Sequence, residues 1–358
     1  MNLSFHHLNT VLRGYWHDTA MPEAADLNDA QLWHIARQHR LTPVLYRWGQ
    51  THANALLETP HLKASMLHFA ARQVRSLHAM QALVARLHER GVPVVPFKGL
   101  LLALQLYEDV ALRPSADTDL YVPTAHIHDA VAALQDLGYH NELLQQYHLD
   151  TLVPRVYTLE FSHPQQRMLL DVHWDVTDGY VPPLFAPHEL TPHPLPGTEL
   201  STFTPEVTLA LIAVHGAKDS WAHLSALLDL ALFVKRYPHA DYAAVVTRLQ
   251  RHGLVRMLTV GAVLIRHFWD VPLPSAIAAA VDERAQALAL LLRQRLESHP
   301  DGLPPTGWAK VRLNLQFRQT STQKWRYLRF KSRVKKVDLS RRGRLPRVLA
   351  HWRRVWRT

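Results

Sequence analysis

The spacing of apolar residues changes twice along this chain, and that change constrains the fold more than any other feature. Residues 1–90 and 201–298 repeat apolar side chains every three or four positions, which predicts helices. Residues 91–200 instead place short runs rich in β-branched and aliphatic residues between helical segments. We therefore expect an α+β fold, in which a small mixed β-sheet is flanked by N- and C-terminal helical regions.

Prolines, glycines and charge divide the chain further. We expect an N-terminal helical region, a sheet-containing region, a C-terminal helical domain and a basic, aromatic-rich helical tail, at residues 1–90, 91–200, 201–298 and 299–358. Within the second region, strands are expected at 92–97, 118–123, 155–162 and 167–176, and helices at 99–109 and 125–139. The last two strands are separated by "HPQQ", which suits a hairpin. A proline-rich linker follows at 181–197.

Composition excludes several classes of protein. The chain has 358 residues and no cysteine, so disulfides, thiolate zinc sites and a cysteine nucleophile are excluded. The 25 histidines are scattered rather than grouped at the spacing of metal ligands. No apolar run is as long as a membrane span, and the first residues lack the pattern of an export signal. We expect a cytoplasmic protein.

The net charge of +10 is concentrated at the C-terminus. From Lys324 to the end there are 14 lysines and arginines and one acid, Asp338, which gives this tail a charge of +13 and leaves −3 for the rest of the chain. The high isoelectric point therefore belongs mainly to the tail.

The segment "RPSADTDLYV" (113–122) places two carboxylates, Asp117 and Asp119, on one face of a predicted strand. Like charges at this distance raise each other's pKa unless a positive charge compensates them, and a divalent metal ion is a common compensation. A solvated acidic face is the alternative for two acids taken alone. Alternation in the later strand places Asp171 and His173 on one face and Leu170 and Val172 on the other. If the two strands are neighbours, three carboxylates converge, a ligand set that suits magnesium.

The segment "PFKGLLLAL" places Lys98 and Gly99 where a strand leads into a helix. Glycine permits close approach of the backbone, the start of a helix offers free N–H groups to an anion, and lysine adds a charge suited to phosphate. An ordinary loop with a solvated lysine is the alternative for this pair taken alone.

These motifs occur in the order of a known family. "VPVVPFKGLLLALQLYEDVALRPSADTDLYV" followed by "LLDVHWDV" resembles a bacterial nucleotidyltransferase-like family, which has the fold shared by DNA polymerase β and the kanamycin nucleotidyltransferases. The similarity includes "HGAKDSWAHLSALLDLALFV" and the N-terminal helices, and so covers most of the chain. Two features depart from the pattern: Lys98-Gly99 replaces the Gly-Ser found in many members of the fold, and Phe97 replaces an aliphatic residue.

The resemblance implies metal-dependent transfer of a nucleoside monophosphate from an NTP to an acceptor, in a sheet of the nucleotidyltransferase palm type. Asp117 and Asp119 would hold two Mg²⁺ ions, or Mn²⁺, and Asp171 would bind the catalytic ion and help to deprotonate the acceptor. Lys98, Gly99 and Arg113 would hold the triphosphate. For Arg113, a structural salt bridge with Asp117 is the alternative.

The acceptor is expected to be a small molecule, a peptide or a protein. A non-catalytic nucleotide-sensing or interaction protein on the same fold, with a tail that contacts nucleic acid, is the alternative function.

Several further side chains have two interpretations. His215, Lys218, Trp221 and Asp229 lie at roughly helical spacing, where we expect packing for Trp221 and a ligand contact for Lys218. Tyr107 and Trp174 are expected in the core, and His173 beside Asp171.

The basic tail also has alternatives. It interleaves arginines with Trp325, Tyr327, Phe330, Trp352 and Trp356, and could bind nucleic acid or an anionic membrane. We expect instead that the tail docks on the protein through its aromatic side chains.

Overall fold

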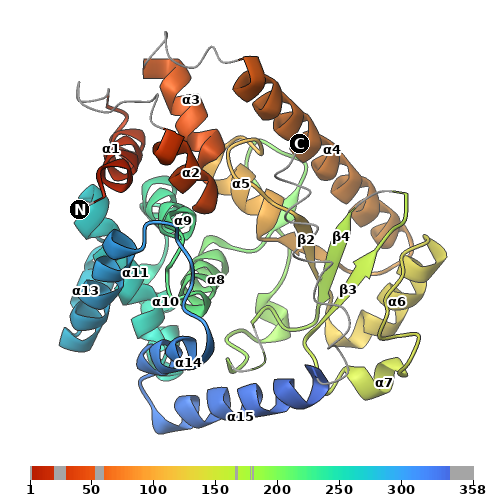
Figure 1. The fold of residues 1–358 in the computed structure, drawn as a ribbon. Coiled ribbons are helices and arrows are strands. Elements are labelled where there is room, and N and C mark those ends of the chain that lie inside the picture. Colours follow the sequence, from red (N-terminus) through yellow and green to blue (C-terminus); the bar gives the residue numbers. More distant parts are fainter. Residues whose placement is uncertain are drawn as a thin grey trace.

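A computed structural model describes residues 2–19, 30–52, 60–165, 168–177, 179 and 181–338 (Figure 1). Its central element is a four-stranded mixed sheet in the order β1-β2-β4-β3, formed by β1 (Val95–Phe97), β2 (Asp117–Tyr121), β3 (Thr158–Ser162) and β4 (Leu169–His173). The β2 and β4 strands are parallel, whereas β1 and β3 join the two edges in antiparallel orientation. Helices lie on both sides in sequence, so the expected α+β class is confirmed.

The two faces of the sheet differ in chemistry, as alternation along β4 predicts. Met168, Leu170 and Val172 lie in a buried cluster with Leu120 of β2. Helices α4 (Pro60–Glu89) and α6 (Ile127–Asp136) contribute to the same cluster and cover this face. The opposite face carries the acids of β2 and β4 and His173, together with Tyr121, whose ring lies 5.8 Å from that of Phe203. The polar face is therefore directed toward the C-terminal helices.

Most of the remaining helices belong to a helical body, whereas the short α7 joins the cluster on the apolar face of the sheet. The N-terminal ones are α1 (Leu3–His17), α2 (Ala30–Gln38) and α3 (Thr42–His52), and α5 (Gly99–Tyr107) and the short α7 (Leu149–Leu152) belong to the sheet region. The C-terminal ones are α8 (Pro205–Lys218), α9 (Leu224–Arg236), α10 (Tyr242–Arg251), α11 (Val255–Trp269), α12 (Ser275–Ala279), α13 (Glu283–Ser298), α14 (Gly307–Gln316) and α15 (Ser321–Asp338). None of the described helices combines the length and apolar character that a membrane span requires.

The N-terminal helices pack on the C-terminal ones rather than on one another alone. The Trp16 indole donates to the Ala231 carbonyl of α9 at 3.2 Å, and the Trp269 indole of α11 donates to Asn9 Oδ1 at 3.1 Å. Apolar side chains of α1 to α3 share one large core with α8 to α13. The N-terminal and C-terminal helices thus form one helical body. The division of the chain into the four regions 1–90, 91–200, 201–298 and 299–358 stays a prediction.

A break between α8 and α9 corrects the expectation of helical spacing from His215 to Asp229. Ser220 and Trp221 both adopt left-handed backbone conformations, with φ of 58° and 51°. The Trp221 ring is fully buried, its indole donates to the Met257 carbonyl, and it lies against two glycines of α8 and α11, Gly216 and Gly261. The ring fits because neither glycine has a side chain that would collide with it. The expected packing of Trp221 is confirmed.

The proline-rich segment 181–197 is packed on the protein, where Val181, Leu184 and Leu195 are buried. It leads into a small two-stranded sheet of β5 (His193–Pro194) and β6 (Ser201–Thr202). The Thr-Pro start of α8 follows, with Thr204 as its N-cap. The apolar side chains of this segment therefore anchor it to the protein, whereas most of its prolines are exposed.

The described part of the basic tail, up to Asp338, packs on the protein through two of its aromatic residues. Tyr327 of α15 is 1% exposed, and Phe330 packs against the large core and Gly179. Trp325, which we expected to help dock the tail, is instead 71% exposed. Its position on the helix explains the difference, because it lies on the side opposite Tyr327. Trp352 and Trp356 lie outside the described residues.

Replacement of Gly261 by Ala should destabilise the protein. An added Cβ would lie 2.5 Å from the Trp221 ring, and such overpacking costs about 1 to 3 kcal/mol. The cost should fall when Trp221 is Leu, because the nearest ring atoms are then absent. Urea unfolding of the two single variants and the double variant measures both effects. Equal costs of Gly261→Ala in the two backgrounds would show that Trp221 is not the obstacle.

Candidate active site

Two predicted carboxylates and a histidine meet on the polar face of the sheet. In the parallel pairing of β2 with β4, Asp119 lies opposite Asp171. His173, two residues further along β4, forms a 2.9 Å hydrogen bond between its Nε2 and Asp119 Oδ1. One ligand atom from each of these three residues lies within 4.8 Å of the others. Sequence alternation placed His173 on the correct face, but its bond to Asp119 rather than Asp171 depends on the strand register.

Asp117 is separated from this group. It pairs with Leu169 at the start of β2, where the residue is exposed, and its backbone carbonyl accepts a 2.9 Å hydrogen bond from the Ser115 hydroxyl. Partial removal from water and the charge of Asp119 raise the pKa of Asp117. The proposed metal ligands Asp117, Asp119 and Asp171 thus share one face of the sheet, but the close group consists of Asp119, Asp171 and His173.

Sequence reasoning missed a fourth carboxylate. Glu160 of β3 lies opposite Asp171 of β4 in the antiparallel pair, and its charge contributes to the raised pKa of Asp171. Paired residues of an antiparallel ladder point to the same face. The predicted hairpin contained this signal, since a register that pairs Glu160 with Asp171 follows once the loop length is known.

The junction between β1 and α5 has a strained backbone. Lys98 has φ of 55° and ψ of −151°, a region that residues other than glycine rarely occupy, and Gly99 has φ of 37°. A Cβ on Gly99 would lie 2.7 Å from the Ser115 hydroxyl. The Lys98 ammonium lies 3.5 Å from Asp119 Oδ1 and 4.6 Å from the centre of the Phe97 ring. The start of α5 is thereby held close to the carboxylates.

Arg113 has a structural contact that the sequence did not identify. Its Nε donates to Asp229 Oδ1 at 2.9 Å and its NH2 donates to Asp229 Oδ2 at 3.0 Å. The NH1 group donates to the Gly99 carbonyl, and Tyr107 donates its hydroxyl to the same Asp229 at 2.8 Å. Of the two interpretations of Arg113, the structure has the salt bridge. Its partner is Asp229 of α9 rather than the expected Asp117. This contact argues against its assignment to the triphosphate.

The end of α8 faces the carboxylates from the helical body. His215 lies close enough to Asp119 and Asp219 to lower the pKa of both. Lys218 lowers the pKa of Asp219 in the same way, and Asp219 also forms a 2.9 Å ion pair with Lys310. Lys218 thus belongs to a charged group beside the site, and its contact with a ligand stays a prediction.

The two paired carboxylates, Asp119 and Asp171, differ in their affinity for protons. Burial raises the pKa of Asp119, but Lys98 and the hydrogen bond from His173 outweigh it, so that this pKa lies below the usual value. Burial and the charges of Asp119 and Asp117 raise the pKa of Asp171 to about 8. At neutral pH the site therefore combines an ionised Asp119 with a largely protonated Asp171.

The charge and donor atoms of this group fit a divalent cation. Carboxylate oxygens suit Mg²⁺ and Mn²⁺, and the imidazole of His173 is also a ligand for transition metals. Burial and neighbouring carboxylates disfavour the anion of Asp171 and raise its pKa, and a bound cation would favour that anion. We conclude that Asp119, Asp171 and His173 could hold a metal ion.

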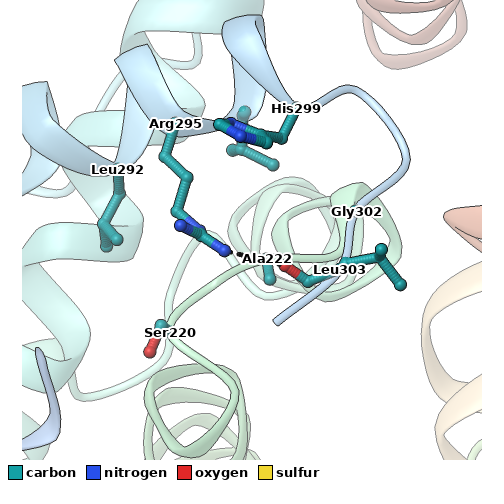
Figure 2. A pocket seen from close by; sticks show the side chains of 8 residues that line it. Ser220, Ala222, Leu292, Arg295, His299, Gly302 and Leu303 are labelled. Atoms are coloured by element: carbon teal, nitrogen blue, oxygen red, sulfur yellow. Dashed lines mark hydrogen bonds between the residues drawn. The ribbon is translucent and has the colours of Figure 1, made fainter. Parts of the chain in front are cut away.

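Two cavities found in the described residues lie away from the carboxylates. One of about 10 Å³ is lined by Ser220, Arg295 and His299 beside the α8–α9 break (Figure 2). It has room for about one water molecule and none for a nucleotide. A second, of about 120 Å³, lies between α4 and α6, behind the sheet. Neither can serve the carboxylates.

Comparison with known protein families identifies the family of the chain. The family described as "Uncharacterised nucleotidyltransferase" matches residues 25–270. The chain belongs to this family. The matched range contains the sheet, the carboxylate group, helices α8 and α9, and the Arg113–Asp229 pair. No curated protein and no solved structure matches the chain.

Replacement of Lys98 by Gly should separate backbone strain from charge. Lys98→Gly and Lys98→Ala both remove the ammonium, but only glycine tolerates the backbone conformation. We expect Lys98→Gly to be more stable than Lys98→Ala by about 1 kcal/mol. Both variants should bind nucleotide more weakly than the parent protein. Urea unfolding and isothermal titration measure the two effects, and equal stability of the variants would argue against strain at this position.

The metal-free protein should lose stability as the pH rises from about 4 to about 8. The folded-state pKa of Asp171 is raised to about 8, so the folded protein holds a proton that the unfolded chain has lost above about pH 4. Asp171→Asn should remove this dependence and be the more stable protein at pH 8 in the presence of EDTA.

Thermal melts over a pH series test the effect of Asp171, and the control is Asp129→Asn, an exposed carboxyl of α6 on the opposite side of the sheet. Added Mg²⁺ should narrow the gap between Asp171→Asn and the parent protein at pH 8. If the stability of Asp171→Asn and that of the parent protein changed with pH in parallel, the raised pKa would not belong to Asp171.

Proposed function

We propose that this protein is a metal-dependent nucleotidyltransferase that moves a nucleoside monophosphate from an NTP to an acceptor and releases pyrophosphate. The observation that supports this most strongly is the pairing of Asp119 with Asp171 on adjacent parallel strands, in a chain of the nucleotidyltransferase family. The start of α5 and Lys98 lie next to that pair, as an anionic substrate requires.

Each group has a role in this proposal. Asp119, Asp171 and His173 hold a divalent cation, Mg²⁺ or Mn²⁺, and Asp117 at the open end of β2 is the candidate ligand for a second. Lys98 and the N–H groups at Gly99 bind the triphosphate. Lys218 of α8 is a further candidate for contact with a phosphate. Arg113 supports the Gly99 backbone from behind instead of binding substrate.

The reaction requires little covalent chemistry from the protein. A nucleophilic oxygen or nitrogen of the acceptor forms a bond with the α-phosphorus, the bond from that phosphorus to the bridging oxygen of the β-phosphate breaks, and pyrophosphate leaves with the electron pair. Asp171 in its ionised form accepts the proton that the acceptor loses. Bound cations would neutralise charge on the phosphate oxygens and align the reacting atoms.

The acceptor is the open part of this proposal, with a small molecule, a peptide or a protein as the candidates. The decisive experiment incubates the protein with each α-³²P-labelled NTP, Mg²⁺ or Mn²⁺, and a fractionated cell extract. We expect label in one distinct product and release of pyrophosphate. The location of the protein in the cytoplasm stays a prediction.

Matched variants identify the groups that carry activity. Asp119→Asn and Asp171→Asn should abolish transfer and metal-dependent NTP binding while the protein remains folded. Asp117→Asn should retain metal-dependent binding of the first ion if the close group is the primary site. Metal-dependent binding without transfer in any fraction would instead favour a nucleotide-sensing protein, and unchanged binding in Asp119→Asn would exclude this metal site.

A further inference from the structure

Two tryptophans are exposed on the last two described helices, α14 and α15. Trp308 of α14 is 83% exposed and Trp325 of α15 is 71% exposed. Most tryptophans of soluble proteins bury much of their ring, because the apolar area is large. Two such rings in water on neighbouring elements of the chain therefore require an explanation.

Each tryptophan is followed by an exposed arginine one helical turn later. Trp308 precedes Arg312 in "WAKVR", and Trp325 precedes Arg329 in "WRYLR". Residues four positions apart lie on the same side of a helix, so both helices present an aromatic ring and a guanidinium side by side. Arg326 is also exposed beside Trp325.

The opposite side of α15 holds the helix on the protein. Gln323, Tyr327 and Phe330 point inward, and the guanidinium of buried Arg318 lies 4.2 Å from the centre of the Tyr327 ring. In Figure 1 this helix runs along the lower edge of the molecule, remote from α4. The exposed rings are thus presented by an anchored helix.

The charge of this part of the chain selects an anionic partner. Between Asp301 and Asp338 the sequence contains ten lysines and arginines and no acid. Exposed large apolar side chains on α14, and on α15 as far as Lys331, are limited to the two tryptophans. A helix that inserts into a membrane needs a continuous apolar side, and here the apolar side of α15 is buried against the protein. These features favour a partner with stacked rings and spaced negative charges.

We propose that α14 and α15 bind a single-stranded nucleic acid, whose bases stack on Trp308 and Trp325 and whose phosphates contact Arg312, Arg326 and Arg329. Base stacking on an aromatic ring is tolerant of sequence, and arginine pairs with phosphate in a bidentate manner. The proposal does not rest on the proposed transfer reaction, although Lys310 of α14 connects this surface to the charged group beside the carboxylates through its ion pair with Asp219.

Fluorescence anisotropy with the full chain tests this proposal. The probes are labelled oligo(dT) and oligo(U) of about 12 nucleotides and an abasic oligomer of the same length and charge. We expect the base-containing probes to bind more tightly than the abasic one. Trp308→Ala and Trp325→Ala should each weaken their binding about tenfold and leave the abasic probe unchanged. The dT and U arms distinguish DNA from RNA, and preferential binding of either one supports the proposal.

Controls separate stacking from charge and from folding. Trp325→Phe should retain most of the affinity, Arg75→Gln on α4 should change nothing, and Arg329→Gln should reduce the steepness of the salt dependence between about 50 and 200 mM. Thermal melts establish that the variants are folded. Equal binding of the abasic probe, unchanged affinity in both tryptophan variants, or tighter binding to phosphatidylserine vesicles than to oligonucleotides would each overturn the proposal.

Discussion

A buried ion pair connects the sheet to the helical body. Arg113 precedes β2, Asp229 belongs to α9, and the two form a bidentate contact while the same guanidinium donates to the Gly99 carbonyl. Removal of one partner of such a pair leaves an uncompensated charge in the interior, which typically costs about 3 to 5 kcal/mol. The position of the strained Lys98–Gly99 junction relative to the carboxylates therefore depends on a contact between segments more than 100 residues apart.

The charges of the site form an ordered series across the sheet. Glu160, Asp171 and Asp119 lie opposite one another on β3, β4 and β2, and Phe97 of β1 continues the row. Lys98 stabilises the anion at Asp119, which is the last carboxylate of the row, and Asp171 between two acids is the one whose pKa rises to about 8. Burial and repulsion along this row both favour the protonated form of Asp171, so Asp171 is the carboxyl on which a bound cation would have its greatest effect.

Local patterns predicted the elements of the sheet, because alternation and helix ends depend on neighbouring residues alone. The α+β class and the apolar side of β4 followed from such patterns. Contacts that depend on register or on distant segments did not follow, which is why Glu160 was missed and Arg113 was placed beside Asp117. The break at Ser220 and Trp221 was also unpredictable from periodicity, because its cause is the fit of a ring between glycines of α8 and α11.

That break also determines how the helical body meets the sheet. If the helix continued without a break from residue 205 to 236, its axis would keep one direction as it passes the carboxylates. The left-handed turn instead ends α8 with His215 near Asp119, and it starts α9 so that Asp229 reaches Arg113. One ring buried between two glycines thus accompanies two approaches to the site: His215 lowers the pKa of Asp119, and Asp229 holds the Arg113 side chain that donates to the Gly99 carbonyl. The helical body is for this reason part of the candidate active site and not only a covering for the sheet.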